Sequence, residues 1–503
     1  MEENLTPVPE PVPEHPFMAR GREFLFGGVT LLLSVLMCNF VLYGGFHLAF
    51  GLVALSAIGC AWLYLKKSGR RFGRYEKALL ILSMIICTGF GRSGDSFVKL
   101  VMLLFLFGAV NLALCIGAGQ NRRDPNGAAS LLDAPRAFFP LGFGNLGKSF
   151  SGLSAGFRQG GQTTRRIGAV GTGLLISIPF LMVMIFLLMR ADAAFEALVD
   201  LMPEFELEEY LRSAFFGFLL AWVLYSRGVS LVKAQKAPAP CRSRKGANPL
   251  TVNTVLLMVS LVYIAYLLSQ LAYFSGGLSG ILPEGYTLAQ YARRGFFEMA
   301  WLCTINLGLL CGSIWLIREE QLPRMTRIAG TFLAAITVFL ILTASAKMLL
   351  YIGSYGLTRL RVLTEVIMLW LGLTTVLITI RFFRPGFGYM KAVVLTAMIL
   401  GTLVFWVDVN SVVARYNVRA YQSGKLETVD VSHIATLGNA GIPWLLELTE
   451  DEDPQVAEAA QNLLKYRMEH PEYYFYEIDD FRSWNYTRSR AEACVDMYRE
   501  SKS

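Results

Sequence analysis

Residues 24–65 read FLFGGVTLLLSVLMCNFVLYGGFHLAFGLVALSAIGCAWLYL, and this stretch contains no Asp, Glu, Lys or Arg. A helix needs about 20 apolar residues to cross the hydrocarbon core of a bilayer, so a stretch of this length accommodates two crossings. Gly44 and Gly45 lie near its middle, where a hairpin would turn. The stretch therefore predicts a pair of membrane-spanning helices.

The rest of the chain repeats this character. Apolar residues make up 54% of the sequence and charged residues only 17%, whereas soluble domains carry about a quarter charged residues. No apolar run alternates with period two, which excludes a β-barrel. We therefore predict an all-α, polytopic helical membrane bundle of about eleven spans with a small C-terminal α-helical soluble domain. The predicted spans are residues 24–44, 46–65, 77–90, 98–118, 167–189, 212–232, 250–274, 296–317, 328–352, 362–380 and 389–407.

Changes in composition divide the chain into five parts. The first is acidic and Pro-rich instead of basic, which predicts a disordered tail and not a cleaved signal peptide. The last is charged and aromatic with apolar residues at helical spacing. The predicted parts are a cytoplasmic tail (1–22), N-terminal membrane spans (23–119), a basic Gly/Phe-rich interfacial loop (120–166), the main membrane bundle (167–408) and an extracytoplasmic helical domain (409–503).

The basic residues predict the orientation of the spans. Lys and Arg collect in the loops at 66–77, 120–166 and 227–245, whereas the segment at 192–209 is acidic. Basic loops stay on the cytoplasmic side. The N-terminus is therefore expected inside and the C-terminal domain outside. This parity requires the short run at 77–90 to be a full crossing, and a re-entrant segment there is the alternative.

Composition argues against several classes of function. The net charge of +8 resides in short loops between apolar runs, which is typical of membrane topology and not of a nucleic-acid-binding face. The eight cysteines form no CxxC pair, and the four histidines lie in different regions. We therefore expect no metal site, no cofactor and no catalytic residue set.

Gly142-Phe-Gly-Asn-Leu-Gly147-Lys148-Ser149 matches the phosphate-binding P-loop pattern letter for letter. A P-loop also needs a buried strand before it and a helix after it within an α/β domain. The surrounding loop is too short for such a domain, which argues against nucleotide binding at Gly142–Ser149. We interpret the segment as interfacial, with phenylalanines in lipid and cations at anionic headgroups.

Ionisable residues at the outer ends of the later spans are the candidate site. Glu298, Lys347, Arg361, Glu365 and Asp408 are expected to share one layer there. Arg293 and Arg294 lie in an outer loop against the positive-inside trend, which predicts nearby acidic partners. A charge within a span is costly unless it is paired or functional. The layer is therefore either a network of ion pairs between helices or a site for a substrate, ion or proton.

Three motifs in this layer carry a family resemblance. They are Tyr291-Ala-Arg-Arg-Gly-Phe-Phe-Glu298, Tyr351-Ile-Gly-Ser-Tyr355-Gly-Leu-Thr358-Arg-Leu-Arg361, and Asp408-Val-Asn410 followed by Ala414-Arg-Tyr-Asn417. In this order they resemble a bacterial multi-pass membrane family catalogued as a domain of unknown function and indexed four-one-seven-three. The likeness begins near residue 70 and includes Arg92, Asn111 and Trp484-Asn485.

The resemblance implies a protein of the bacterial cytoplasmic membrane and assigns no catalytic residue. Because its motifs coincide with the charged layer, the candidate set is Arg293, Arg294, Glu298, Lys347, Tyr355, Thr358, Arg361, Glu365 and Asp408.

Three functions remain open. The first is a non-enzymatic envelope scaffold or sensor, embedded in the lipid bilayer and with an envelope protein as its partner. The second is a transporter that uses Glu298, Lys347, Arg361 and Glu365, although no inverted repeat is visible. The third is an enzyme acting on a lipid-linked substrate, with Glu298, Glu365 or Asp408 as general base.

Overall fold

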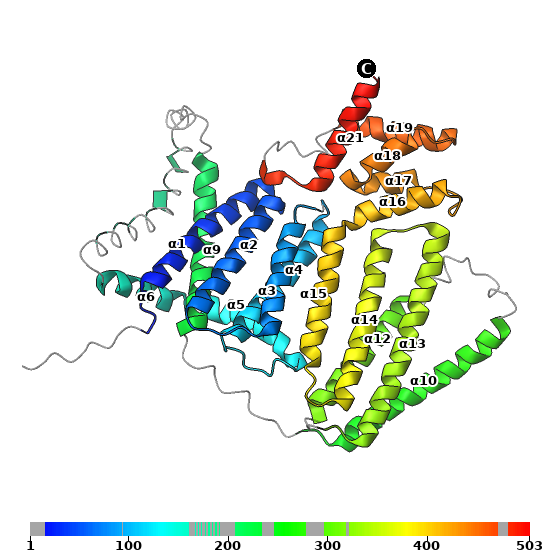
Figure 1. The fold of residues 1–503 in the computed structure, drawn as a ribbon, viewed down its shortest axis with the longest axis horizontal. Coiled ribbons are helices and arrows are strands. Elements are labelled where there is room, and N and C mark those ends of the chain that lie inside the picture. The colour runs from blue at the N-terminus through cyan, green and yellow to red at the C-terminus, as the bar shows by residue number, and fades with distance from the viewer. Residues whose placement is uncertain are drawn as a thin grey trace, which may run out of the picture.

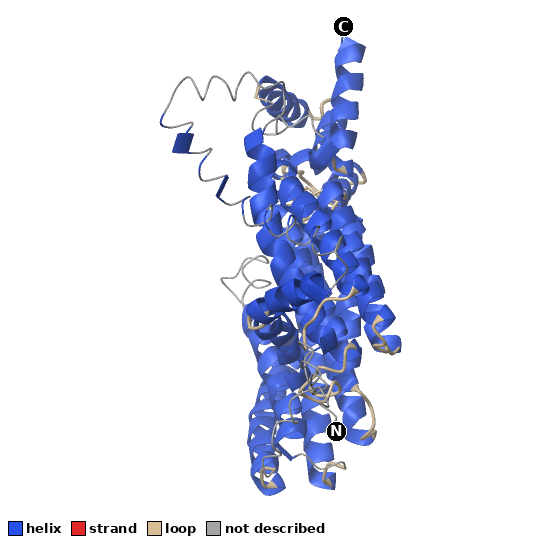
Figure 2. Cartoon of the chain, turned by 90° about the vertical axis from the view of Figure 1, so that its left-hand side faces the viewer, coloured by secondary structure: helices blue, strands red, loops and turns tan. Residues whose placement is uncertain are grey.

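The structure is a computed structural model that describes residues 16–92, 94–159, 207–233, 246–277, 296–317, 321–470 and 481–502, with isolated positions between 166 and 191. Helices and turns account for all of the regular structure in these residues, and no strand occurs among them (Figure 2). The predicted all-α fold is confirmed.

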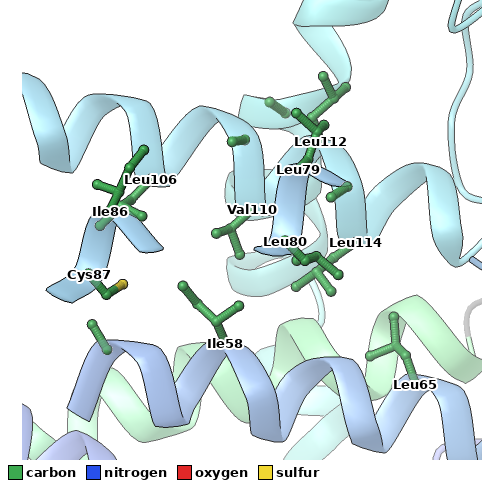
Figure 3. Packing of buried hydrophobic residues seen from close by; sticks show 14 of the residues in the cluster. Ile58, Leu65, Leu79, Leu80, Ile86, Cys87, Leu106, Val110, Leu112 and Leu114 are labelled. Carbon is green, nitrogen blue, oxygen red and sulfur yellow. The ribbon is translucent and has the colours of Figure 1, made fainter. Parts of the chain in front are cut away.

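The first half of the chain forms a bundle around one apolar core. Leu79, Leu80 and Ile86 are fully buried at its centre, between helices that run up and down the bundle (Figures 1 and 3). A π-helical turn at Phe40–Gly44 extends the first helix. The helices of this first bundle are α1 (Gly21–Asn39), α2 (Leu48–Lys67), α3 (Arg74–Gly89), α4 (Ser96–Gly117) and α9 (Leu207–Lys233).

A second bundle lies beside the first, and the two share a helix. Met398 and Phe405 of α15 belong to the core of the first bundle, whereas Met390 and Val393 of the same helix belong to the second (Figure 1). The helices of the second bundle are α10 (Pro249–Gly277), α12 (Phe296–Ile317), α13 (Arg324–Tyr355), α14 (Arg359–Phe383) and α15 (Tyr389–Val407).

The C-terminal domain is a cluster of shorter helices on one end of the two bundles, at the top of Figure 1. Val413, Ile434 and Leu445 are fully buried in its own core, to which α14 also contributes. We call this end of the bundles the domain end. The helices are α16 (Val409–Gln422), α17 (Val431–Thr436), α18 (Ile442–Leu448), α19 (Pro454–Glu469) and α21 (Tyr486–Lys502), with 3₁₀ turns at Gly438–Ala440 and Phe481–Ser483.

Nine helices in the described residues are long and apolar enough to cross a membrane, which makes the chain a multi-pass membrane protein. They correspond to nine of the predicted spans. The predicted span at 167–189 lies almost wholly outside the described residues. The predicted span at 77–90 is α3, which has 16 residues and is about 24 Å long.

Helix α3 is continuous and does not turn back on itself. It starts after the loop that follows Lys67 and ends at Gly89, just before α4 begins at Ser96, and it packs against α2, α4 and α15. A re-entrant segment would return to the end where it began. The course of α3 therefore agrees with a crossing from one end of the bundle to the other.

The predicted interfacial segment folds into short helices at the opposite end of the bundle, which we call the basic end. Asp133 is fully buried there and accepts hydrogen bonds from the backbone of Arg122 and Arg123, each at 3.1 Å. Phe139 and Phe143 are about half exposed; their contact with lipid stays a prediction. The helices are Ala128–Leu132, α5 (Asp133–Phe138), Phe139–Phe143 and α6 (Leu146–Gln159).

The segment Gly142–Ser149 lies within this helical region. A π-helical turn precedes it, and no strand lies before it in the described part of the chain. Ser149 is buried, and its hydroxyl donates to Ser226 Oγ of α9 at 3.2 Å. The segment therefore packs against a membrane helix in a setting unlike the strand-loop-helix of a P-loop. The expectation against nucleotide binding stays a prediction.

A close approach of α2 and α3 generates the first testable prediction. A Cβ added at Gly51 would lie 2.1 Å from the carbonyl oxygen of Cys87, whereas one at Gly59 of the same helix would meet only Met84 Cε at 3.7 Å. Overpacking costs about 1–3 kcal/mol, and replacing a helical glycine by alanine gains about 1 kcal/mol. We expect Gly51→Ala to lower the unfolding temperature of the detergent-purified protein and Gly59→Ala to leave it unchanged or raise it. Equal unfolding temperatures for the two variants would contradict the packing described.

Candidate functional site

A cavity of about 980 Å³, with several charged side chains in its walls, lies between the domain end of the bundles and the C-terminal domain. Its walls come from six places far apart in the sequence. They are the turn between α1 and α2, the start of α4, the start of α14, the junction of α15 with α16, the turn between α17 and α18, and the segment leading into α21. We call it the interface cavity. Its ionisable and amide-bearing lining residues include His47, Asp95, Lys99, Arg359, Asp408, Asn410, Asn485 and Arg488.

Asp95 joins three helix beginnings at this cavity. As the N-cap of α4, its carboxylate accepts a hydrogen bond from the Val98 backbone N–H at 3.0 Å. It also forms an ion pair with Arg359 at the start of α14 and accepts from Asn410 Nδ2 of α16 at 3.3 Å. Burial alone would raise the pKa of Asp95, but the Val98 N–H and the Arg359 guanidinium outweigh burial and lower it. The carboxylate is therefore charged at neutral pH.

Asp408 links the membrane helices to the last helix of the chain. It has φ +49° and is the only non-glycine with positive φ in the described residues. Aspartate tolerates this left-handed conformation better than most residues, and here it ends α15 and begins α16. Its carboxyl group accepts hydrogen bonds from Ser411 Oγ at 2.6 Å and from Thr487 Oγ1 of α21 at 3.0 Å. Burial raises the pKa of Asp408.

His47 and Lys99 form an unusual pair on the wall of the cavity. Lys99 is only 6% exposed, and its ammonium donates to His47 Nδ1 at 3.1 Å. Burial, and then the charges of Lys99 and Arg488, lower the pKa of His47 to about 4. The imidazole is therefore neutral at pH 7 and accepts through Nδ1. No carboxylate lies within ion-pair distance of Lys99 among the described residues; its direct partner is the neutral His47, and the Asp95 carboxylate attracts it only from a greater distance.

The segment entering α21 fixes the C-terminal domain to the bundle. The Tyr486 backbone N–H donates to the Gly91 carbonyl at 2.8 Å. The Arg92 guanidinium lies between two rings, 4.9 Å from the centre of Tyr486 and 5.6 Å from that of Trp406. Nearby, Arg482 forms an ion pair with Glu209 of α9. The domain is thus held by backbone, aromatic and ionic contacts together.

The predicted charge layer is only partly assembled at this cavity. Of its members that the structure describes, Asp408 lines the cavity and Glu298, Lys347 and Glu365 do not. These three lie on α12, α13 and α14 of the second bundle. Arg293 and Arg294 lie outside the described residues.

Three of the predicted site residues make contacts within the turn between α13 and α14: Tyr355, Thr358 and Arg361. The Arg361 guanidinium donates to the carbonyl oxygens of Tyr355, at 3.1 Å, and Gly356, and it lies 4.1 Å from the centre of the Tyr351 ring. Thr358 caps α14 by accepting from the Arg361 backbone N–H at 3.4 Å. Arginine at this place satisfies the last carbonyls of α13, which have no partner within the helix.

Sequence reasoning did not select His47, Asp95 or Lys99 as site residues. Lys99 is the only charged residue of α4, and a lone cation inside an apolar run is a signal for a functional or paired group. Asp95 directly precedes that run and has the character of a helix N-cap. His47 carried no comparable signal.

The arrangement is suited to binding an acidic group. Lys99, Arg359 and Arg488 place three cations on the wall; Arg359 is paired with Asp95, Arg488 is paired with Glu492 of its own helix, and Lys99 has no ion pair among the described residues. Asn410 Oδ1 is buried and has no hydrogen-bond partner in the described structure. Within that structure no group of three or more His, Cys, Asp or Glu residues is placed to hold a metal ion.

A family model described as Domain of unknown function (DUF4153) matches residues 27–448. No curated protein and no solved structure matches the chain. The motifs quoted above resembled a family with a different index, four-one-seven-three, and the match corrects that index. The matched residues include nearly all of the two bundles and the first three helices of the C-terminal domain, α16 to α18, but neither α19 nor α21. Because the match covers most of its length, the chain belongs to the family described as Domain of unknown function (DUF4153).

Proposed function

We propose that the protein is a non-enzymatic membrane sensor that binds a small molecule bearing an acidic group in the interface cavity and presents its C-terminal domain to an envelope protein. The observation that carries this proposal is the buried Lys99 ammonium, which lines the cavity and has only the neutral His47 as its hydrogen-bond partner. A buried charge without a charged partner is costly, and an anion that entered the cavity would remove that cost.

Binding in this cavity would act on the position of the C-terminal domain. Lys99 belongs to a membrane helix, whereas Arg488 belongs to α21; both line the cavity, and the Arg488 side chain is largely buried. A ligand that contacts both residues adds an attraction between the bundle and the domain. It therefore stabilises the docked arrangement by its own binding free energy. This coupling is what a sensor requires.

A second candidate function, transport, is supported by one observation. Glu365 lies within a span, and its Oε1 atom is buried without a hydrogen-bond partner in the described structure. A carboxyl group at membrane depth is a common element of proton pathways. Transport ranks below sensing because Glu365 does not line the interface cavity.

The distribution of charge supports the proposed orientation. The ends of α2 and α9 meet at the basic end, where Arg70 donates to the Val232 carbonyl and Lys233 lies 3.5 Å from Glu23. The chain before α1 is at this end too, since the Ala19 backbone N–H donates to the Gly152 carbonyl at 2.9 Å. Basic loops face the cytoplasm. We place the N-terminus inside a bacterial cytoplasmic membrane and the C-terminal domain outside it.

Ligand binding can be tested by thermal unfolding of the detergent-purified protein with succinate, L-glutamate or glycerol 3-phosphate. A ligand at a hundred times its Kd stabilises the folded state by about 2.7 kcal/mol. We expect at least one compound to raise the unfolding temperature of the unaltered protein, and Lys99→Gln to abolish the rise. Lys391→Gln, which removes a cation outside the cavity, should retain it. The proposal fails if no compound acts, or if Lys99→Gln responds like the control.

Orientation can be tested by cysteine labelling in a variant without native cysteines. Lys67 and Glu427 are both exposed and lie at opposite ends of the molecule. In intact cells, a membrane-impermeant maleimide should label Glu427→Cys and not Lys67→Cys, and both should react after the cells are broken. Labelling of Lys67→Cys alone in intact cells would reverse the proposed topology.

A further inference from the structure

A second cavity, of about 450 Å³, lies inside the first bundle between α1, α2, α4 and α9. We call it the bundle groove. Its volume is within the range of small-molecule sites, about 300–1,000 Å³. The walls are mainly aliphatic and aromatic side chains, among them Phe26, Leu33, Met37, Ala57, Leu106 and Leu114. Such walls fit a hydrocarbon chain.

One cation interrupts this apolar lining. Arg227 lies on α9, six residues before the helix ends at Lys233 at the basic end, within a candidate membrane span, and is 7% exposed. It lines the groove and forms no hydrogen bond or ion pair with any residue that the structure describes. A guanidinium at membrane depth stays charged and is costly unless an anion accompanies it. The groove therefore combines an apolar chain site with one uncompensated positive charge.

Two acidic residues near this end of the bundle, Glu23 and Asp133, are already engaged. Glu23 lies 3.5 Å from Lys233 and accepts from the Arg20 backbone N–H at 2.9 Å. The buried carboxylate of Asp133 lies 3.0 Å from the Arg123 guanidinium. Neither forms an ion pair with Arg227, nor does any other carboxylate that the structure describes, so a bound anion would supply the missing negative charge.

Two further polar atoms face the same space. Asn111 and Ser34 line the groove, and their Oδ1 and Oγ atoms are buried without hydrogen-bond partners in the described structure. Buried polar atoms usually have a partner. The Ser34 hydroxyl can donate a hydrogen bond to a bound carboxylate, whereas Asn111 Oδ1 only accepts and is not satisfied by one.

We propose that the bundle groove binds a long-chain fatty acid, with its carboxylate paired to Arg227 and its chain along the apolar walls. A single carboxylate matches a single guanidinium in charge, and the two groups can form parallel hydrogen bonds. This site is separate from the interface cavity and does not depend on the function proposed for it.

Palmitate binding to the delipidated, detergent-purified full chain tests the proposal, with hexadecanol as the uncharged ligand of equal chain length. Palmitate is expected to raise the unfolding temperature and hexadecanol is not. The Arg227→Gln variant loses the charge-assisted hydrogen bonds to the palmitate carboxylate, which should weaken palmitate binding by about tenfold or more. Arg384→Gln removes an exposed arginine elsewhere and should bind palmitate normally. Ala57→Phe should block binding by filling the groove.

A second measurement separates ligand binding from a structural role. Without palmitate, Arg227→Gln should unfold at the same or a higher temperature than the unaltered protein, because it removes an unpaired buried charge. A lower unfolding temperature without ligand would mean that Arg227 stabilises the fold, and would overturn the proposal. So would equal effects of palmitate and hexadecanol, or tighter Arg227-dependent binding of lysophosphatidate than of palmitate. If Ala57→Phe does not fold, the comparison of palmitate binding by Arg227→Gln and by Arg384→Gln decides whether the proposal holds.

Discussion

The buried carboxylate of Asp95 is the contact on which the assembly at the domain end depends. It holds the first turn of α4, the guanidinium of Arg359 on α14 and the amide of Asn410 on α16. Removing Arg359 would leave the carboxylate of Asp95, only 5% exposed, without its cation, whereas removing Asp95 would leave a guanidinium that is 38% exposed and can be solvated. One side chain thereby joins the first bundle, the second bundle and the C-terminal domain, and it does so at the wall of the interface cavity.

The membrane helices could be predicted from the sequence because each one is determined by the apolar residues of its own segment. An apolar run of about 20 residues is stable across a bilayer whatever its neighbours are, since every backbone hydrogen bond is made within the helix. For the same reason the predicted run at 98–118 closely matches α4. Helix α3 was the least certain span because it is short, and its packing between α2, α4 and α15 is a tertiary property that hydropathy does not contain.

The candidate site could be predicted only in part, because its contacts join distant parts of the chain. His47 and Asn485 are 438 residues apart, and their side chains lie 3.4 Å from each other. The spacing of residues in the sequence carries no sign of such a pair. Conversely, Arg361 was selected for its charge, but its guanidinium binds carbonyl groups six residues or fewer away. A charged residue near a helix end can cap the neighbouring turn or meet a distant partner, and only the fold distinguishes the two.

Helix α15 has a mechanical consequence. Its side chains pack into both bundles, and at Asp408 it continues directly into α16 of the C-terminal domain. A tilt of one bundle against the other must therefore carry α15 with it, because packed helices move as rigid bodies. The left-handed backbone conformation of Asp408 separates α15 from α16, so the two helix axes differ in direction (Figure 1). A tilt of α15 would therefore move α16 sideways. In this geometry α15 transmits a change in the relative tilt of the two bundles to the C-terminal domain. A change in the tension or thickness of the surrounding bilayer would alter that tilt.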